Sequence, residues 1–293
     1  MNPIPFATSP VPPLAIRVYS PESVLKHPGV MAREMVADVW AGRELAWRLF
    51  VRDLSAQYRQ TFLGYVWAFL PPLAASLTFI FLNAQGIVKI DTGGMPYAAF
   101  AMMGTLLWQV FVDAMQMPSQ ALAQARPMLA KINFPREAIL MAGAYMVGFN
   151  FLVRLVLLVG VMAWWKVVPN QSLALFLPAI LALVICGMAF GMMLAPLGGL
   201  YGDITRGIPI VAQFWMLLTP VVYPARTSGL AGALAQFNPV SPLIVTARET
   251  LSGQPLTFLP AFVLVTIISL LVLIAGWIGF RIAMPHLIAR MGG

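Results

Sequence analysis

Long apolar runs separated by short polar breaks constrain this chain more than any other feature of its sequence. The chain is 60% hydrophobic and only 10% charged, whereas soluble domains carry about 25% charged residues. Because 293 residues cannot bury this much apolar surface in one core, the excess must face lipid. The sequence therefore predicts an all-α membrane protein whose six transmembrane helices fill residues 62–281, at about 62–83, 97–117, 138–165, 173–197, 208–223 and 257–280.

The basic residues predict how these spans are oriented. Of the 18 lysines and arginines, most precede the first span, follow the last one or lie in the two breaks assigned to the same side. Only Lys89, Lys166, Arg226 and Arg248 fall on the other side, and Arg154 lies inside a span. Since positive charge is retained in the cytoplasm, both termini are expected there, in a bacterial inner membrane, with residues 282–293 as a cytoplasmic tail.

The N-terminal region predicts two different segments. Residues 1–30 are rich in proline and have no apolar core typical of a cleaved signal peptide, so a cytoplasmic extended arm is expected. Residues 31–61 predict an amphipathic helix. Such a helix beside a span lies in the membrane interface, although packing on a soluble partner is the alternative. Its apolar stripe includes Trp47, Phe50, Val51, Leu54 and Tyr58, and its polar stripe Arg48, Arg52, Ser55 and Arg59.

Prolines and polar residues interrupt the spans in three places. The Pro71-Pro72 pair is expected to kink or divide the first span. Residues 118–137 form a polar cytoplasmic break in which a short helix is plausible. Residues 224–256 are too polar to cross the membrane, and predict two short helices at about 229–236 and 242–251.

Two charged residues are predicted inside the hydrocarbon. Asp113 falls near the cytoplasmic end of the second span, and Arg154 about two-thirds of the way through the third. Such groups face a bundle interior or a wet cavity. Arg154 either contacts an anionic or hydroxyl-rich cargo, or forms a structural pair or snorkels. Depth counting puts the two at different levels, so they are not expected to pair.

The residues argue against catalysis by this chain alone. None of the four lysines has the surroundings of a phosphate-binding loop, and no cluster of histidine and acidic residues has metal-ligand spacing. Paired carboxylates for acid–base chemistry are also missing. The chain is thus expected to be a transport protein without its own cofactor. A transferase for polyprenyl lipids and a proton-coupled carrier remain as alternatives.

Three stretches resemble the permease subunit of ABC-2-type exporters for polysaccharides, the family of O-antigen, capsule and teichoic-acid export. The most specific stretch runs from Arg52-Asp53-Leu54 through Tyr58-Arg59-Gln60-Thr61 into Leu63-Gly64-Tyr65-Val66-Trp67 and Pro71-Pro72. The others are residues 129–136, and residues 218–224 with Asn238-Pro239 and Arg248 downstream. The resemblance covers about residues 30–280.

The resemblance implies a homodimer bound to two copies of a separate ATPase, which binds ATP and Mg. The cargo would be an undecaprenyl-linked polysaccharide, as in O-antigen of lipopolysaccharide or capsule; another cargo, such as a drug or a lipid, is the alternative. The coupling helix that meets the ATPase would lie at about 119–136, where plain positive-inside charge is the other explanation for the basic residues. Re-entrant periplasmic gate helices would lie at about 229–251. The residues implied are Arg126, Lys131, Phe134 and Arg136 for coupling, and Pro239, Arg248 and Glu249 for the gate.

A sugar route should expose aromatic rings, because sugars stack their C–H faces on them. The first two spans offer Trp67, Phe69, Trp108 and Phe111. Ordinary packing or contact with lipid is the alternative role for each of these rings.

Overall fold

The computed structural model describes residues 28–58, 66, 70–86, 90, 92, 94–129, 134–169, 171–225, 232, 235 and 237–291. Within these ranges every regular element is a helix. Residues 1–27 of the predicted proline-rich arm lie outside the described residues, and residues 28–30 belong to the first helix. Arg59, Trp67, Phe69, Lys131 and most of the first predicted gate helix also lie outside.

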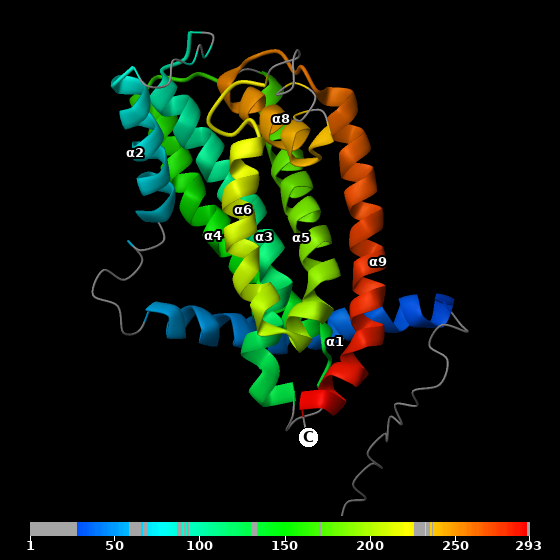
Figure 1. The fold of residues 1–293 in the computed structure, drawn as a ribbon. Helices are drawn as coiled ribbons and strands as arrows, with labels where there is room; N and C mark the ends of the chain where they lie inside the picture. The colour runs from blue at the N-terminus through cyan, green and yellow to red at the C-terminus, as the bar shows by residue number, and fades with distance from the viewer. Residues whose placement is uncertain are drawn as a thin grey trace, which may run out of the picture.

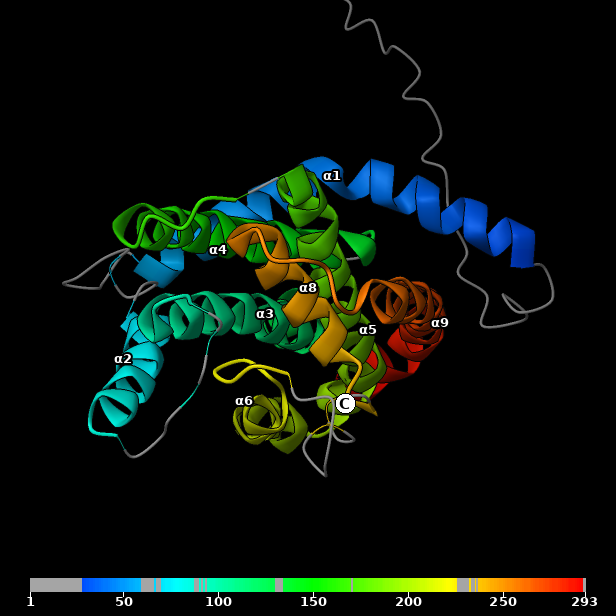
Figure 2. The same cartoon turned by 90° about the horizontal axis from the view of Figure 1, so that it is seen from above.

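The long helices stand side by side, and one further helix crosses the bundle near its lower end, with the last turns of α3 and α9 extending below it (Figure 1). The crossing helix is α1, Pro28–Tyr58, and the short helix α8 lies at the opposite end of the bundle. Seen from above, α1 runs along one side of the bundle next to α4, while α2 and α6 lie on the opposite side (Figure 2). The other bounds are α2 Leu70–Ala84, α3 Tyr97–Leu129, α4 Glu137–Trp164, η3 Gln171–Leu175, α5 Phe176–Leu200, α6 Gly202–Leu218, α8 Val240–Ser252 and α9 Leu259–Met291.

Four helices in the described part of the chain are long and apolar enough to cross a membrane. They are α3, α4, the continuous segment formed by η3 and α5, and α9. Helices α2 and α6 have 15 and 17 residues, fewer than the roughly 20 that span a bilayer. The multi-pass helical class is confirmed, and the count of six spans stays a prediction.

One sequence prediction about proline is corrected, and another stays a prediction. Helix α2 begins at Leu70, so Pro71 and Pro72 occupy its first turn, where the missing N–H has no helical partner to lose. Most of residues 62–69 lie outside the described part of the chain, so the kink or division of the first span stays a prediction. Helix α3 does not end at Met117 but continues to Leu129 with Pro118 and Pro127 inside it. Pro118 is buried against α5, and this packing holds the helix together across the break.

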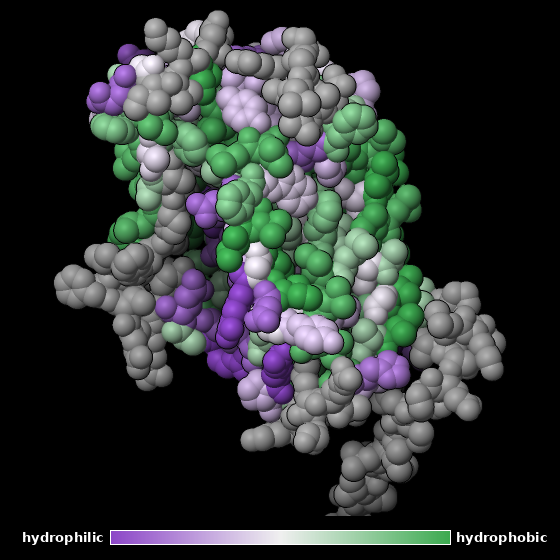
Figure 3. Space-filling model, viewed as in Figure 1, coloured by the Kyte–Doolittle hydropathy of each residue, from purple (hydrophilic) through white to green (hydrophobic). Residues whose placement is uncertain are grey.

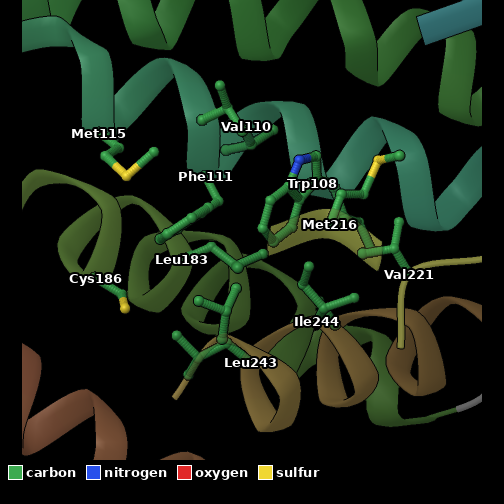
Figure 4. Close-up of a cluster of buried hydrophobic side chains, with 14 of the residues drawn as sticks. Trp108, Val110, Phe111, Met115, Leu183, Cys186, Met216, Val221, Leu243 and Ile244 are labelled. Atoms are coloured by element: carbon green, nitrogen blue, oxygen red, sulfur yellow. The ribbon is translucent and has the colours of Figure 1, made fainter. Parts of the chain in front are cut away.

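Close packing of α3 on α5 depends on two glycines. An ideal Cβ on Gly187 would lie 2.5 Å from the carbonyl oxygen of Phe111, and one on Gly191 would lie 2.3 Å from that of Met115. Small residues four apart allow two membrane helices to approach backbone to backbone. The core grows from this contact: Trp108, Val110, Phe111 and Met115 of α3 meet Leu183 and Cys186 of α5, with Met216 of α6 and Leu243 and Ile244 of α8 (Figure 4).

Replacing Gly191 by alanine should destabilise the fold by about 1–3 kcal/mol, because the added methyl group overpacks the α3–α5 contact. Gly148→Ala on α4 is the matched control, since nothing lies within 4 Å of its Cβ position. Thermal unfolding of the purified protein measures both. Equal melting temperatures for the two variants would show that the close approach does not matter.

Candidate functional site

A cavity of about 720 Å³ lies between α1, α3 and α4, and we call it the α1–α3–α4 cavity. Apolar residues cover much of the middle of the molecule, with hydrophilic residues gathered below them, near the level of α1, and others at the upper end (Figure 3). The apolar lining of the α1–α3–α4 cavity includes Met117, Met146 and Val147. The polar lining consists of Arg52, Asp53 and Gln57 from α1, Asp113, Gln116, Gln120 and Gln124 from α3, and Asn150 from α4.

Three glutamines form a row along the cavity. Gln116, Gln120 and Gln124 are four residues apart on α3, so they share one face over about 12 Å of helix. The Gln120 amide donates a hydrogen bond of 2.7 Å to the Gln116 carbonyl oxygen. This row exists only because α3 continues past the predicted end of its span.

An ion pair lies at the inner end of the cavity. Asp113 Oδ2 accepts hydrogen bonds from Arg154 Nη1 at 2.6 Å and from Asn150 Nδ2 at 2.9 Å. The prediction that Asp113 and Arg154 do not pair is therefore wrong. Depth counting took the second span to end at Met117, whereas Asp113 lies in the middle of a longer helix, and the long arginine side chain covers the remaining distance. The structure favours the structural role for Arg154.

At the mouth of the cavity, α1 is attached to α4 and to the end of α3. Phe50 is buried against Tyr145 and Phe149 of α4, and the exposed Trp47 ring lies 5.2 Å from the Phe50 ring. Arg52 pairs with Asp53 at 2.7 Å, and its Nη1 lies 3.1 Å from the Met128 sulfur of α3. Arg48 forms an exposed pair with Glu44 of the same helix. The Tyr58 side chain lies outside the described part.

A second ionic cluster joins α1, α4 and α9. Arg281 of α9 pairs with Asp38 at 3.0 Å, with Glu137 at 2.6 Å and with Glu34 at 3.4 Å. Asp38 and Glu137 are buried, so their charges depend on the guanidinium for compensation. Gly42 of α1 also lies against Ala138 of α4. Helix α1 is thus held to the bundle along its length, and not only at the cavity.

Of the residues predicted to contact an ATPase, the described ones (Arg126, Phe134 and Arg136) lie at the α1 end of the bundle, around the end of α3. Arg126 Nη2 donates to the carbonyl oxygens of Gly198 at 3.3 Å and Gly199 at 2.6 Å. These carbonyls belong to the last turn of α5, where a cation also offsets the helix dipole. Phe134 packs half-buried beside the cluster of Leu122 and Leu287. Arg136 occupies the position before α4.

The residues predicted for the gate lie at the opposite end. Pro239 directly precedes α8, and all of α8 up to Leu251 is buried. Arg248 donates to the Val221 carbonyl at 2.9 Å and lies over the Phe100 ring, 3.7 Å from its centre. Glu249 accepts hydrogen bonds from the backbone and the hydroxyl of Thr257. These two charges therefore anchor α8 to α3, to the segment after α6 and to the segment that leads into α9.

Trp108 and Phe111 are core residues in this conformation. Both are at most 2% exposed, and their rings lie 6.3 and 5.4 Å from that of Trp215. Of the two roles that the sequence left open for them, the structure favours packing.

Sequence reasoning missed several residues that organise these sites. Asn238 accepts from Trp215 Nε1 and donates to the Thr219 hydroxyl, which fixes the chain between α6 and α8. The Arg281 cluster joins residues far apart in the sequence, so no local pattern indicates it. The spacing of Gln116, Gln120 and Gln124 was visible, and a longer second helix would have predicted their shared face.

The family to which these features belong follows from comparison with known proteins. The ABC-2 type transporter family matches residues 44–252, from the middle of α1 to the end of α8. The chain belongs to this family.

Two relatives extend the comparison to whole proteins. The O-antigen export system permease protein RfbA of Myxococcus xanthus is 24% identical over 210 residues, 72% of this chain and 80% of that protein. A protein of the same description from Klebsiella pneumoniae is 21% identical over 213 residues, 71% of this chain and 80% of its own length. The similarity therefore covers most of the ABC-2 chain and of each relative.

Removing the guanidinium in Arg281→Met should destabilise this ABC-2 protein by about 3 kcal/mol, because buried carboxylates lose their compensating charge. Arg48→Met is the control, since the exposed pair of Arg48 with Glu44 contributes about 1 kcal/mol at most. Thermal unfolding gives the stabilities, and hydrogen exchange should report faster opening of α1 in Arg281→Met alone. Identical exchange in the two variants would contradict the role of the cluster.

A double-mutant cycle tests the pair at the inner end of the cavity. Arg154→Met should destabilise the protein because it leaves Asp113 uncompensated, and Asp113→Asn added to it should restore part of the loss. A coupling energy of about 1–3 kcal/mol is expected from melting measurements. Additive effects of the two substitutions would show that the groups do not interact.

Proposed function

We propose that this chain is the membrane-spanning subunit of an ATP-driven exporter that moves a lipid-linked polysaccharide across the bacterial inner membrane. The observation that carries the proposal is the similarity to two permease proteins of O-antigen export, which extends over more than two-thirds of the chain. Membership of the ABC-2 family supports a partner ATPase as the source of energy.

The finer arrangement is part of the same proposal. Two copies of the chain assemble with two copies of the ATPase, and both termini lie in the cytoplasm. The positive-inside distribution of the arginines supports this orientation, and it assigns the α1 end of the bundle to the cytoplasmic side. ATP and Mg are bound by the partner subunit, and this chain forms the path of the polysaccharide across the membrane.

Contacts at the end of α3 suggest how ATP hydrolysis drives transport. The ATPase meets the segment 119–136, which contains the last turns of α3. Arg126 joins those turns to the carbonyls where α5 ends and the chain turns into α6. A displacement of the end of α3 would therefore reach the last turn of α5, directly before α6, through the Arg126 side chain.

Co-expression with candidate ATPase subunits and purification through a tag on this chain tests the proposal. The two proteins should co-purify and hydrolyse ATP. Each of Lys131→Ala and Arg136→Ala should weaken ATPase capture about fivefold, the effect of losing about 1 kcal/mol from one charged contact. Lys166→Ala, at the opposite end of α4, is the control.

Cargo is tested in cells that depend on this protein for export. Loss of this protein should leave lipid-linked polysaccharide on the cytoplasmic side of the membrane. ATP hydrolysis by the purified complex should become faster when that polysaccharide is added. Stimulation by a drug or a simple lipid instead would identify a different ABC-2 cargo. A monodisperse chain that captures no ATPase would overturn the proposed function altogether.

A further inference from the structure

The charges of the α1–α3–α4 cavity compensate one another. Arg52, Asp53 and Asp113 are its charged lining residues among those described. Arg52 pairs with Asp53 at 2.7 Å, and Asp113 pairs with Arg154 at 2.6 Å. Among the described residues, these pairs leave no net charge to attract an ionic ligand, because each cation is held by a carboxylate. A phosphate or an acidic sugar would have to compete with these pairs.

The amides supply the hydrogen bonds that the charges do not. Gln57 and Gln124 make no side-chain hydrogen bond with the described residues, and Gln120 and Gln116 bond only to each other among them. An amide both donates and accepts hydrogen bonds, as a sugar hydroxyl does. A phosphate oxygen only accepts, and an acyl chain would leave the amides without partners, which is costly.

The size and apolar lining of the cavity suit the same ligand. Its volume of about 720 Å³ lies within the range of roughly 300–1,000 Å³ found for ligand sites. From α4, the half-buried Met146 adds an apolar side chain to the lining, against which the C–H face of a sugar ring can pack. The row extends over about 12 Å, which accommodates more than one ring.

From these observations we infer that the α1–α3–α4 cavity is a binding subsite for uncharged sugar units, with Gln116, Gln120 and Gln124 as the groups that hold their hydroxyls. This inference rests on the proposed function, and it assigns the first polar contacts of the sugar chain to the interior of each subunit. The ion pair of Asp113 and Arg154 closes the inner end and positions Asn150 without contacting the sugar.

Protection from chemical labelling tests the subsite. Gln120→Cys in a Cys186→Ala background, purified with its ATPase in lipid nanodiscs, is labelled with a membrane-impermeant maleimide. Nanodiscs avoid maltoside detergents, whose sugar headgroups would compete. Maltotriose at about three times its Kd should slow labelling about fourfold, since only the free fraction reacts. Gln171→Cys, on the exposed η3 helix, should label at an unchanged rate.

The acidic trisaccharide trigalacturonate separates neutral from anionic recognition. It should protect Gln120→Cys far less than maltotriose does. Equal protection by both would overturn the preference for uncharged sugars, and unchanged labelling up to the solubility limit of maltotriose would overturn the subsite. Ala56→Cys, which lines the cavity from α1 and is none of the three glutamines, is labelled in parallel, so that protection is also measured with all three sugar ligands intact.

Export in cells provides an independent readout. The double variant Gln116→Leu/Gln120→Leu should lower the rate of polysaccharide export severalfold while still capturing the ATPase, whereas Gln171→Leu should export normally. Normal export by the double variant would contradict the subsite and leave the proposed function intact. Failure of the unmodified chain to capture an ATPase would contradict the proposed function instead.

Discussion

The close contact between α3 and α5 is the interaction on which the rest of this structure depends. Gly187 and Gly191 bring the two helix backbones together, and the buried rings of Trp108 and Phe111 fill the space above them. In a bilayer, where lipid tails are as apolar as leucine, such packing replaces the hydrophobic effect as the force between helices. Helices α6 and α8 pack on the surface that α3 and α5 form together.

Polar interactions hold the periphery to this centre. Arg281 fastens α1 to α4 and α9, Arg126 fastens the end of α3 to that of α5, and Arg248 fastens α8 to the segment after α6. Each arginine bonds backbone carbonyls or buried carboxylates, because such groups are costly to leave without partners away from water. The α1–α3–α4 cavity lies between these attachments, and among the described residues the glutamines of α3 line it without bonding to a neighbouring helix.

Composition and charge were enough to predict the helical membrane class, and the motif around Arg52 and Pro71-Pro72 was enough to predict the family. Hydropathy failed to predict the full length of α3. The glutamines at 116, 120 and 124 make this part of the chain polar, but they do not end the helix. Hydropathy also failed at Asp113 and Arg154, whose pairing depends on the relative height of two helices. Long-range contacts such as that of Arg281 with Asp38 leave no local pattern.

The uninterrupted length of α3 has a mechanical consequence. At 33 residues it is a rod of about 50 Å. It contacts Arg248 through Phe100 near one tip and carries Arg126 near the other. A hinge between the tips would let entry and exit move independently, but Pro118 is clamped against α5 at the place where the rod would bend. The two ends of the bundle are therefore mechanically coupled, so that a displacement of one end of α3 also moves the other end.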